Sequence, residues 1–576
     1  MLTPEGHPTA TTSVPLVIGV TSHRNIPARE IEPIRQRVRD FFAQLQRDFP
    51  ELPLVVLSAL AEGGDQLVAQ EALAAGATLM APLPLPRDLY VTDFVDPAVR
   101  ASFEALCRQA QIVQLPQRAG QPRHALEADG IPRNRAYAQA GIYISSHCHI
   151  LLAIWDGKAT HRLGGTAQIV NYHLTGAMPD LIDRRQMPQH RLGGGDERLL
   201  YHIVCSRDEA DGAPAAGLLP GQACWRTDGA VVAAADGLPA EFRLMFARMA
   251  EFSADGRKYA AAINTTVQAR HATVRASTAA IDQLFHVADW LAMHFQQRVL
   301  LAMRTTYTLA ALMGIAFTCY ADLPAQDYMI FVFLLLFATG AYIAVLASKR
   351  GWHRKYLDYR ALAEGLRIQS YWRRAGISLT ADHEFAHDNF LQKQDIELGW
   401  IRNVMRAAGL YPPSGMEQPA QAELDAVIAE WVGGPGKTGQ LHYYERKANE
   451  RAHLHRITEL IGRISLWCGI AISVFLAVFV LKLPRDVKTI LVAIMAVLSV
   501  LAAVREAYAY RKADKELIKQ YRFMQRIFAN ASAALATTRT AAEQRDILRE
   551  LGEAALAEHA EWTLMHRERP LEQGRL

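Results

Sequence analysis

The chain has 576 residues, too many for a single hydrophobic core, so we expect several domains. Its 62 basic residues nearly balance its 58 acidic residues, and the net charge of +4 excludes the strongly basic surface of a general nucleic-acid binder. The 6 cysteines are scattered and form neither a disulfide framework nor a zinc-ligand pattern, which is typical of a reducing compartment.

The chain begins with a polar segment, residues 1–13, that lacks the basic start and apolar core of a signal peptide. We expect a short disordered tail there. Residues 14–240 then alternate apolar strand-like runs with helical runs, which predicts a doubly wound α/β domain with a parallel sheet. The expected strands are Pro15–Val20, Leu54–Ser58, Thr78–Pro82, Ile112–Leu115 and His149–Trp155, and the expected helices are Glu30–Phe49, Asp65–Ala75, Pro97–Ala110 and Asn134–Ser146.

Glycine-rich polar loops follow three of these strands. Because ligands of parallel sheets bind at the carboxyl ends of the strands, we expect the loops to form one binding site. Glycines let a phosphate approach the main chain, the helix start at Thr166 offers N–H groups and a hydroxyl, and His23 or Arg24 supplies a positive partner. The candidate ligand-binding residues are Gly19, Thr21, Ser22, His23, Arg24, Glu62, Gly63, Gly64, Asp65, Trp155, Asp156, Gly157, Gly164, Gly165 and Thr166.

The chain resembles the SLOG superfamily in three stretches: GVTSHR from Gly19, SALAEGGDQLVA from Ser58 and LLAIWDGKATHRLGGTA from Leu151. This Rossmann-like group includes LOG phosphoribohydrolases and Smf-type DNA-processing proteins. The resemblance covers roughly residues 14–210 and implies binding of a nucleotide or a nucleotide-derived signal across these loops. It assigns ligand contacts to the first two loops and phosphate binding to the segment 164–166.

The hydrolytic members of this superfamily carry a PGGxGTxxE motif, whose glutamate acts in cleaving a glycosidic bond. The matching segment here, LGGTAQIVN, lacks that glycine spacing and offers Gln168 in place of the glutamate. Glu62 or Asp156 can supply a carboxylate, so a membrane-tethered nucleotide N-glycosidase or phosphoribohydrolase-like enzyme stays open as an alternative. The departure from the motif favours ligand sensing over catalysis, and we assign no catalytic residue, cofactor or metal.

Two apolar hairpins follow the α/β domain, and each consists of two uncharged runs joined by a short polar turn with a proline. Runs of this length can cross a hydrocarbon core, and paired helices satisfy their main-chain hydrogen bonds internally. Buried core helices are the alternative, but the pairing favours a multi-pass membrane protein. The expected spans are Thr305–Ala321, Tyr328–Ser348, Ile464–Leu481 and Thr489–Val504.

Lys and Arg are more frequent beside both hairpins than in the turns within them. This bias predicts that the flanking segments and both termini lie on the cytoplasmic side of the inner (plasma) membrane. No Asp, Glu, Lys, Arg or His lies inside an expected span, which disfavours a transporter or proton relay. Small residues share helix faces, as Gly340 does with Ala344 and Gly469 with Ser473. Such faces allow close helix packing, within one chain or in a homo-oligomer.

Helix-forming segments precede and follow each hairpin, which indicates a duplicated helix–hairpin–helix unit. The following segments, YLDYRALAEGLRIQSYW from Tyr356 and YRKADKELIKQYRFMQRIFANAS from Tyr510, resemble the SLATT group of two-span proteins associated with nucleotide-signalled antiphage defence. The resemblance implies pore formation or membrane disruption once a sensor binds its signal. The expected divisions are 241–375 with the first hairpin (305–348), a connector at 376–441, 442–540 with the second hairpin (464–504), and a C-terminal helix at 541–576.

Three shorter patterns carry less weight. His383–His387 reads HEFAH and fits the HExxH zinc pattern, but no third ligand follows at a suitable spacing, so we expect a surface helix start. Segment 433–438 ends like a phosphate-binding P-loop, yet Trp431 stands where the first glycine belongs, which favours an interdomain loop. His147 and His149 flank Cys148 too closely in sequence for all three to converge on one ion.

Together these patterns predict a Rossmann-like (SLOG-like) α/β domain followed by an all-α, four-span membrane region with long cytoplasmic helices. We expect a nucleotide-signal-gated membrane effector, pore-forming or membrane-disrupting, of a bacterial antiphage defence type. Its expected partners are a nucleotide-derived small molecule, the lipid bilayer and further copies of the chain, and no nucleic acid polymer. A passive membrane scaffold is the other alternative besides the enzyme.

Overall fold

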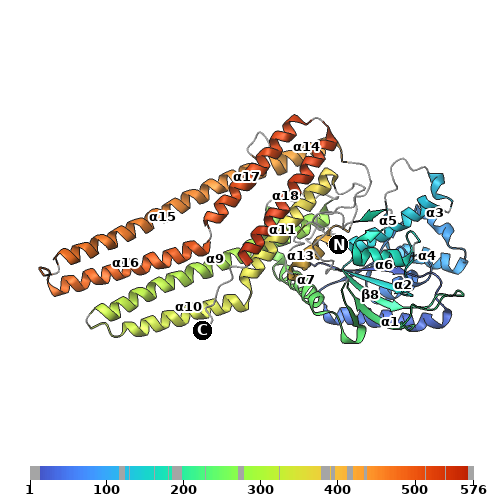
Figure 1. Ribbon diagram of the computed structural model, residues 1–576, viewed down its shortest axis with the longest axis horizontal. Helices are drawn as coiled ribbons and strands as arrows, with labels where there is room; N and C mark the ends of the chain where they lie inside the picture. The colour runs from blue at the N-terminus through green and yellow to red at the C-terminus, as the bar shows by residue number, and fades with distance from the viewer. Residues whose placement is uncertain are drawn as a thin grey trace. The chain divides into compact units, whose positions relative to one another are not determined.

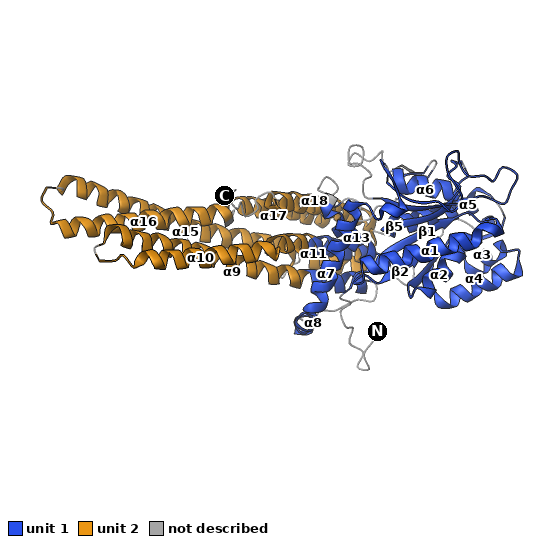
Figure 2. Cartoon of the chain, turned by 90° about the horizontal axis from the view of Figure 1, so that it is seen from below, with its two compact units in different colours: residues 1–288, 362–373, 378–418 blue, residues 289–361, 374–377, 419–576 orange. Residues whose placement is uncertain are grey.

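The computed structural model forms two compact units, coloured blue and orange in Figure 2. Unit 1 comprises residues 1–288, 362–373 and 378–418, and unit 2 comprises residues 289–361, 374–377 and 419–576. Almost all of the expected N-terminal tail, the HEFAH pattern and residues 434–437 lie outside the described residues. The structure describes residues 13–115, 123–128, 130–160, 162–178, 181–183, 198–227, 229–269, 278–323, 325–377, 390, 396–410, 419–433, 438–479, 481–512, 514–538 and 540–567.

The N-terminal part of unit 1, drawn in blue to green in Figure 1, contains a central sheet. This sheet is eight-stranded and has the strand order β10-β9-β8-β5-β1-β2-β3-β4. The six strands from β8 to β4 in that order run parallel, while β9 and β10 continue the sheet antiparallel beyond β8. A short separate sheet pairs β6 with β7. The strands are β1 (Leu16–Ser22), β2 (Leu54–Leu57), β3 (Thr78–Leu83), β4 (Gln111–Gln114), β5 (Ile150–Trp155), β6 (Ala177–Met178), β7 (Ile182–Asp183), β8 (Leu199–Val204), β9 (Ala223–Arg226) and β10 (Val231–Ala233).

The first five strands lie where the apolar runs predict them, each within two residues of its expected bounds. The sheet is nevertheless mixed rather than wholly parallel, because β9 and β10 extend it with antiparallel pairings, while β8 adds a further parallel strand. These three strands are not flanked by the strand–helix alternation that reveals β1 to β5, and β9 and β10 are short. The structure therefore confirms an α/β domain and corrects the composition of its sheet.

Helices cover both faces of this sheet. The ring of Phe41, on α1, lies 4.5 Å from the ring of Tyr201, which shares a face with Val20 through the strand register. The preceding residue, Gly19, points to the opposite face, where an added Cβ would lie 2.7 Å from Ile144 Cγ2 of α5. The α-helices with most of their residues in unit 1 are α1 (Ala28–Asp48), α2 (Gly64–Ala74), α3 (Arg87–Tyr90), α4 (Pro97–Gln109), α5 (Ile131–His147), α6 (Thr166–Thr175), α7 (Ala240–Lys258), α8 (Ala260–Ala269) and α13 (Gly399–Ala408).

Unit 2 is helical. Helices α9, α10, α15 and α16 are long and apolar enough to cross a membrane, and they coincide with the four expected spans. Helices α9 and α11 contribute residues to both units. The helices are α9 (Ala279–Asp322), α10 (Met329–Lys349), α11 (Trp352–Ala375), α14 (Gln421–Val427), α15 (Gly439–Phe479), α16 (Arg485–Lys512), α17 (Asp514–Thr537) and α18 (Ala541–Arg567).

Two of the apolar helices, α9 and α16, contact each other closely. An added Cβ on Gly314 of α9 would lie 2.2 Å from Val500 Cγ1 of α16, so the two helices meet closely there. Nearby, the Tyr307 hydroxyl donates a hydrogen bond to the carbonyl oxygen of Ala507 at 3.3 Å. In each of the four helices, however, no more than 6% of the most apolar segment is buried. This exposure argues against buried core helices and matches side chains that face lipid.

Candidate functional site

The three glycine-rich loops of unit 1 meet at the carboxyl ends of β1, β2 and β5. Strand β1 lies between β2 and β5, because the chain first builds outward through β2, β3 and β4 and then returns to the other side of β1. In open α/β sheets, ligands bind in the crevice beside such a reversal of strand order. The predicted position of the site therefore coincides with the reversal of strand order in this sheet.

Ser22, the last residue of β1, joins all three loops. Its hydroxyl donates a 2.6 Å hydrogen bond to Asp65 Oδ1 in the second loop, and its carbonyl oxygen accepts a 2.7 Å hydrogen bond from the Thr166 hydroxyl in the third. Gly64 fits between these groups because it has no side chain: an added Cβ would lie 2.7 Å from Ser22 Cβ. Three loops that are distant in sequence are thus fixed around one serine.

The Asp65 carboxyl is buried beside this serine, in the first turn of α2, with 4% of its surface exposed. Burial raises the pKa of this carboxyl to about 7, and the hydrogen bond from Ser22 opposes the change only in part. The main-chain N–H groups at the start of α2 favour the charged form. The Asp65 carboxyl therefore changes its protonation state near neutral pH, whereas an exposed aspartate does so near pH 4.

A second polar pair lies between the first and third loops. His23 Nε2 is 3.2 Å from Asp156 Oδ1, and the same carboxylate oxygen accepts a 3.0 Å hydrogen bond from the Lys158 main-chain N–H. Burial lowers the pKa of the His23 imidazole, and the nearby Asp156 carboxylate opposes this change. The imidazole is therefore neutral at pH 7 and supplies a hydrogen-bond donor rather than a full positive charge.

The segment after β8 covers this pair. The Ala215 main-chain N–H donates to the Asp156 carbonyl oxygen at 2.8 Å, and the Asp208 N–H donates to the Asn25 carbonyl oxygen at 2.9 Å. Gly157, which has a φ of +81°, leaves no room for a side chain beside Leu218. Access to the loops is therefore restricted on the β5–β8 side.

Arg24 extends from the first loop toward Asp93, which follows β3, and toward Tyr137 of α5. Its guanidinium is 4.0 Å from Asp93 Oδ2 and 5.9 Å from the centre of the Tyr137 ring, and 45% of its side chain is exposed. The Asp93 carboxylate also accepts hydrogen bonds from Arg133 and from the Tyr137 hydroxyl. Burial and the neighbouring Asp93 carboxylate raise the pKa of Tyr137 to about 12, so this phenol stays protonated.

Sequence reasoning missed Asp93 and Tyr137, which lie beside Arg24, and Arg133, which donates to Asp93. The loop that follows β3 contains no glycine cluster, although it occupies the same edge of the sheet as the other loops. That shared edge was the available signal, because every carboxyl end of a parallel strand near the reversal can contribute a residue. The structure thus adds Asp93, Arg133 and Tyr137 to the predicted set.

The third loop leads into the N-terminus of α6. Gly164 has a φ of +76°, a conformation that favours glycine, and its N–H donates a 3.0 Å hydrogen bond to Gln168 Oε1. Gly165 precedes the first helical residue, Thr166, and its carbonyl oxygen already accepts from the N–H groups of Gln168 and Ile169, so only the N–H groups at the very start of α6 are without intrahelical partners. Such a terminus suits an anion, as predicted, although the Thr166 hydroxyl is already used by Ser22.

The remaining predicted residues lie around the three loops, and their surroundings differ. Gly19 is buried against α5, and Thr21 is buried within β1. The Trp155 indole N–H donates to the Lys158 carbonyl oxygen at 3.1 Å. Glu62 is partly exposed and makes no hydrogen bond or ion pair within the described chain. Gly63, with a φ of +88°, is packed against the main chain of the first loop at Arg24.

One residue of the second loop is strained. Leu60 has a φ of +57°, which costs a non-glycine residue free energy, and its side chain is fully buried. Its N–H donates a 3.1 Å hydrogen bond to the Ser58 hydroxyl oxygen, which holds the strained turn. Strained backbone often occurs at functional loops, and this loop carries Gly64 and Asp65.

The histidines near Cys148 have structural partners. The His149 ring accepts a hydrogen bond from the Val17 N–H at Nδ1 and lies 2.8 Å from the Asn403 carbonyl oxygen at Nε2. Burial lowers the pKa of His149 to about 3, so its imidazole is neutral. Among the described residues, no group of three or more His, Cys, Asp or Glu side chains is placed to hold a metal ion.

The sequence was compared with protein-family models and with curated proteins. No family model matches the chain, and no curated protein matches it.

Proposed function

We propose that this protein is a signal-gated membrane effector. A nucleotide-derived ligand binds at the carboxyl edge of the unit 1 sheet, and binding changes the packing of the four apolar helices so that they permeabilise the membrane. The observation that carries the proposal is the fixing of three loops around Ser22 in a chain that also contains four membrane-length helices.

The chemistry of the loop cluster supports a nucleotide as the ligand. The N-terminus of α6 and the half-exposed Arg24 guanidinium suit phosphate oxygens. The Tyr137 ring beside Arg24 offers an aromatic face for a base. Asp65 and Asp156 offer carboxyl oxygens to hydroxyl or amino groups of a ribose or base. The resemblance of these three loops to SLOG proteins supports the same ligand class and a Rossmann-like assignment.

The membrane part of the proposal follows from the exposed apolar helices and from the resemblance to SLATT proteins. A ligand shifts a conformational equilibrium only by its difference in affinity for the two states. Helix α9 contributes residues to both units, so a change in unit 1 has a continuous helical route toward the apolar helices. We place the protein in the inner membrane with cytoplasmic termini, as a homo-oligomer in antiphage defence.

A thermal-shift screen of the full chain in detergent tests the ligand. Mononucleotides, cyclic nucleotides and dinucleotides are added separately, and a true ligand at a hundred times its Kd stabilises the protein by about 2.7 kcal/mol. We expect the shift to disappear in Gly64→Ala, where an added Cβ meets Ser22, and to persist in Gly229→Ala, where it meets nothing within 4 Å. A shift that Gly64→Ala leaves unchanged would place the ligand elsewhere.

A second candidate function, nucleotide hydrolysis, is favoured by Asp65. A buried carboxyl with a pKa of about 7 beside the Ser22 hydroxyl can act as a general acid or base at neutral pH. Release of free base or sugar phosphate from the bound nucleotide, lost in Asp65→Asn or Glu62→Gln, would support the enzyme. Binding without product release, together with ligand-dependent membrane leakage, supports the effector.

A further inference from the structure

Helix α5 connects the candidate ligand site with the opposite edge of the sheet. Near its start, Arg133 and the Tyr137 hydroxyl donate hydrogen bonds to the Asp93 carboxylate of that site. The helix ends at His147, shortly before β5 begins, and therefore at the amino edge of the sheet. A displacement at the carboxyl edge can reach the amino edge along this one helix.

Helix α5 packs tightly against the third loop and against α6. An added Cβ on Gly164 would lie 2.9 Å from the Ala138 main-chain nitrogen. One on Gly141 would lie 2.5 Å from Ile169 Cγ1 of α6. Because no side chain separates these elements and the interior is close-packed, a displacement of the third loop also displaces α5.

At the amino edge, α5 and the residue before β5 contact α13 at two points. The Tyr143 hydroxyl of α5 donates a hydrogen bond to the Leu410 carbonyl oxygen, just beyond the end of α13. His149 Nε2 lies 2.8 Å from the Asn403 carbonyl oxygen within α13. His149 is itself fixed to β1, because its Nδ1 accepts a 3.1 Å hydrogen bond from the Val17 N–H. The Asn403 contact therefore follows the sheet, whereas the Leu410 contact follows α5.

The other side of α13 is bound to α11. Gln369 Nε2 of α11 donates a 3.0 Å hydrogen bond to the Met405 carbonyl oxygen, and Arg373 Nη2 lies 3.5 Å from the Gly409 carbonyl oxygen. Gly365 allows the two helices to approach, since an added Cβ there would lie 2.7 Å from Met405 Sδ. A shift of α13 therefore acts on α11.

Helix α11 continues from unit 1 into the helical region of the chain. Its residues 362–373 belong to unit 1, and its residues 352–361 belong to unit 2. The membrane-length helix α10 ends at Lys349, and only residues 350 and 351 separate it from α11. A shift of α11 therefore acts on the end of a membrane-length helix.

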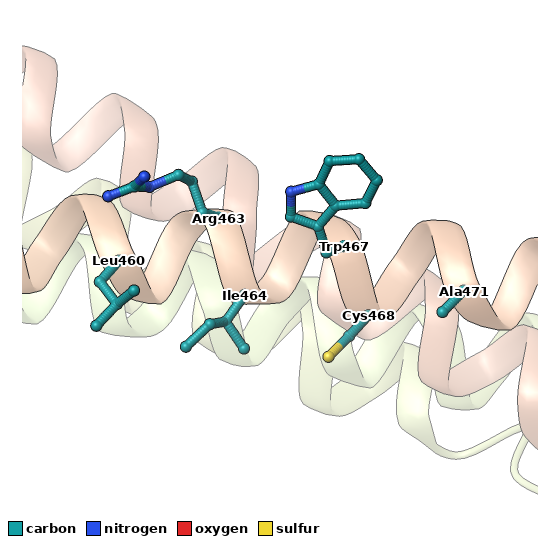
Figure 3. A pocket seen from close by; sticks show the side chains of 6 residues that line it. All are labelled: Leu460, Arg463, Ile464, Trp467, Cys468 and Ala471. Carbon is teal, nitrogen blue, oxygen red and sulfur yellow. The ribbon is translucent and has the colours of Figure 1, made fainter.

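A hollow of about 480 Å³ on α15 has no part in this connection. It is lined only by side chains of α15 (Figure 3), namely Leu460, Arg463, Ile464, Trp467, Cys468 and Ala471. Such a largely apolar surface suits contact with lipid in general and selects no particular ligand.

We infer that α13 couples the ligand site to the membrane region by turning about its Asn403 contact. Ligand binding displaces α5, Tyr143 moves the Leu410 end of α13, and α13 shifts α11. Leu410 is seven residues beyond Asn403, about 10 Å at 1.5 Å per residue, so this end can move while the Asn403 contact stays with the sheet. The inference rests on the proposed function and names the regulation of the same site.

A purely structural role for the Tyr143–Leu410 hydrogen bond is the alternative. The bond then holds α13 on unit 1 and has no relation to the ligand site. The two roles differ in one respect: coupling requires that a change at Asp93 alters α13, and that it does so through Tyr143. A ligand drives such a change only by its difference in affinity for the two arrangements.

Hydrogen exchange of the full chain in detergent, without any nucleotide, tests this coupling by a double-mutant cycle. Asp93→Asn weakens the hold on the start of α5, and Tyr143→Phe removes only the hydroxyl that bonds to Leu410. Exchange is followed by mass spectrometry in α13 and, as an internal reference, in α1. We expect Asp93→Asn to accelerate exchange in α13 about fivefold, as one weakened hydrogen bond of about 1 kcal/mol implies.

The same Asp93→Asn change should have no further effect on α13 in the Tyr143→Phe background, and α1 should exchange at the wild-type rate in all variants. Tyr328→Phe is the matched control, because it removes an exposed phenol hydroxyl that follows α9. Its α13 should exchange as in the wild type.

Three results would overturn the inference. Wild-type exchange in α13 of Asp93→Asn would show that the site and α13 are not coupled. Equal acceleration in α13 and α1 would show a general loss of stability and a structural role only. Additive effects of Asp93→Asn and Tyr143→Phe would exclude Tyr143 as the connection. A nucleotide screen without any ligand would contradict the proposed function and leave the outcome of this cycle unaffected, so the two claims fail separately.

Discussion

Replacing Asp65 with asparagine is expected to remove a large pH-dependent contribution to the stability of unit 1. The Asp65 carboxyl is almost fully buried, and burial raises its pKa from 3.8 to about 7. Between these two values the folded chain holds a proton that the unfolded chain has released. The corresponding stability is therefore fully present below about pH 4, falls as the pH rises toward 7, and changes little above that.

The size of this effect follows from the pKa difference. A shift of about three units corresponds to about 4 kcal/mol, at about 1.4 kcal/mol per unit. Asparagine keeps the shape of the side chain and an oxygen for the Ser22 hydroxyl, but it carries no titrating group. We expect Asp65→Asn to be more stable than the wild type at pH 8 by an amount approaching this value, and to show a flatter profile between pH 4 and 7.

Thermal unfolding of the full chain in detergent, followed by tryptophan fluorescence from pH 4 to 8 at constant ionic strength, measures the effect. About 4 kcal/mol corresponds to roughly 8–16 °C in the unfolding midpoint of a domain of about 150–250 residues, and to less in the larger unit 1. Asp40→Asn, which removes an exposed carboxyl of α1, is the matched control and should keep the wild-type profile. Identical pH profiles for the wild type and Asp65→Asn would refute the assignment of this carboxyl.

Three further predictions concern close packing around the loops and between the apolar helices. Gly64→Ala should weaken nucleotide binding at least tenfold in a titration, because its Cβ would push Ser22 away from its partners, while Gly229→Ala should bind normally. Thr166→Val removes the hydrogen bond to the Ser22 carbonyl oxygen and should lower the unfolding free energy by about 1 kcal/mol; an unchanged midpoint would contradict that bond. Gly314→Ala should separate α9 from α16 and lower the unfolding midpoint in detergent, whereas Gly469→Ala, which has open space around it, should not; equal effects would contradict this contact.

The sequence predicted the elements that local pattern defines. Apolar strands alternating with amphipathic helices located β1 to β5 because each pattern repeats over the length of one element. The four uncharged runs located the membrane-length helices for the same reason, since hydrocarbon thickness sets their length. The three glycine-rich loops met at one edge because parallel strands share the direction of their carboxyl ends.

Contacts between segments that are distant in sequence could not be predicted from such local patterns. Asp93 and Tyr137 join Arg24 only through the folded arrangement of three segments, and neither belongs to a recognisable motif. The segment 396–408 belongs to unit 1, where His149 Nε2 lies 2.8 Å from the Asn403 carbonyl oxygen although the two residues are 254 positions apart in the sequence. The strained turn at Leu60 also has no sequence signature, because leucine rarely adopts a positive φ.

Dye release from sealed vesicles containing the purified protein tests whether ligand binding at Ser22 permeabilises a membrane. The nucleotide that gives the thermal shift is added to vesicles with the wild type, Gly64→Ala or Gly229→Ala. We predict rapid release with the wild type and Gly229→Ala, and none with Gly64→Ala or without nucleotide. Intact vesicles after saturating the wild type with a ligand that binds at Ser22 would contradict the proposal that this protein permeabilises membranes in response to its signal.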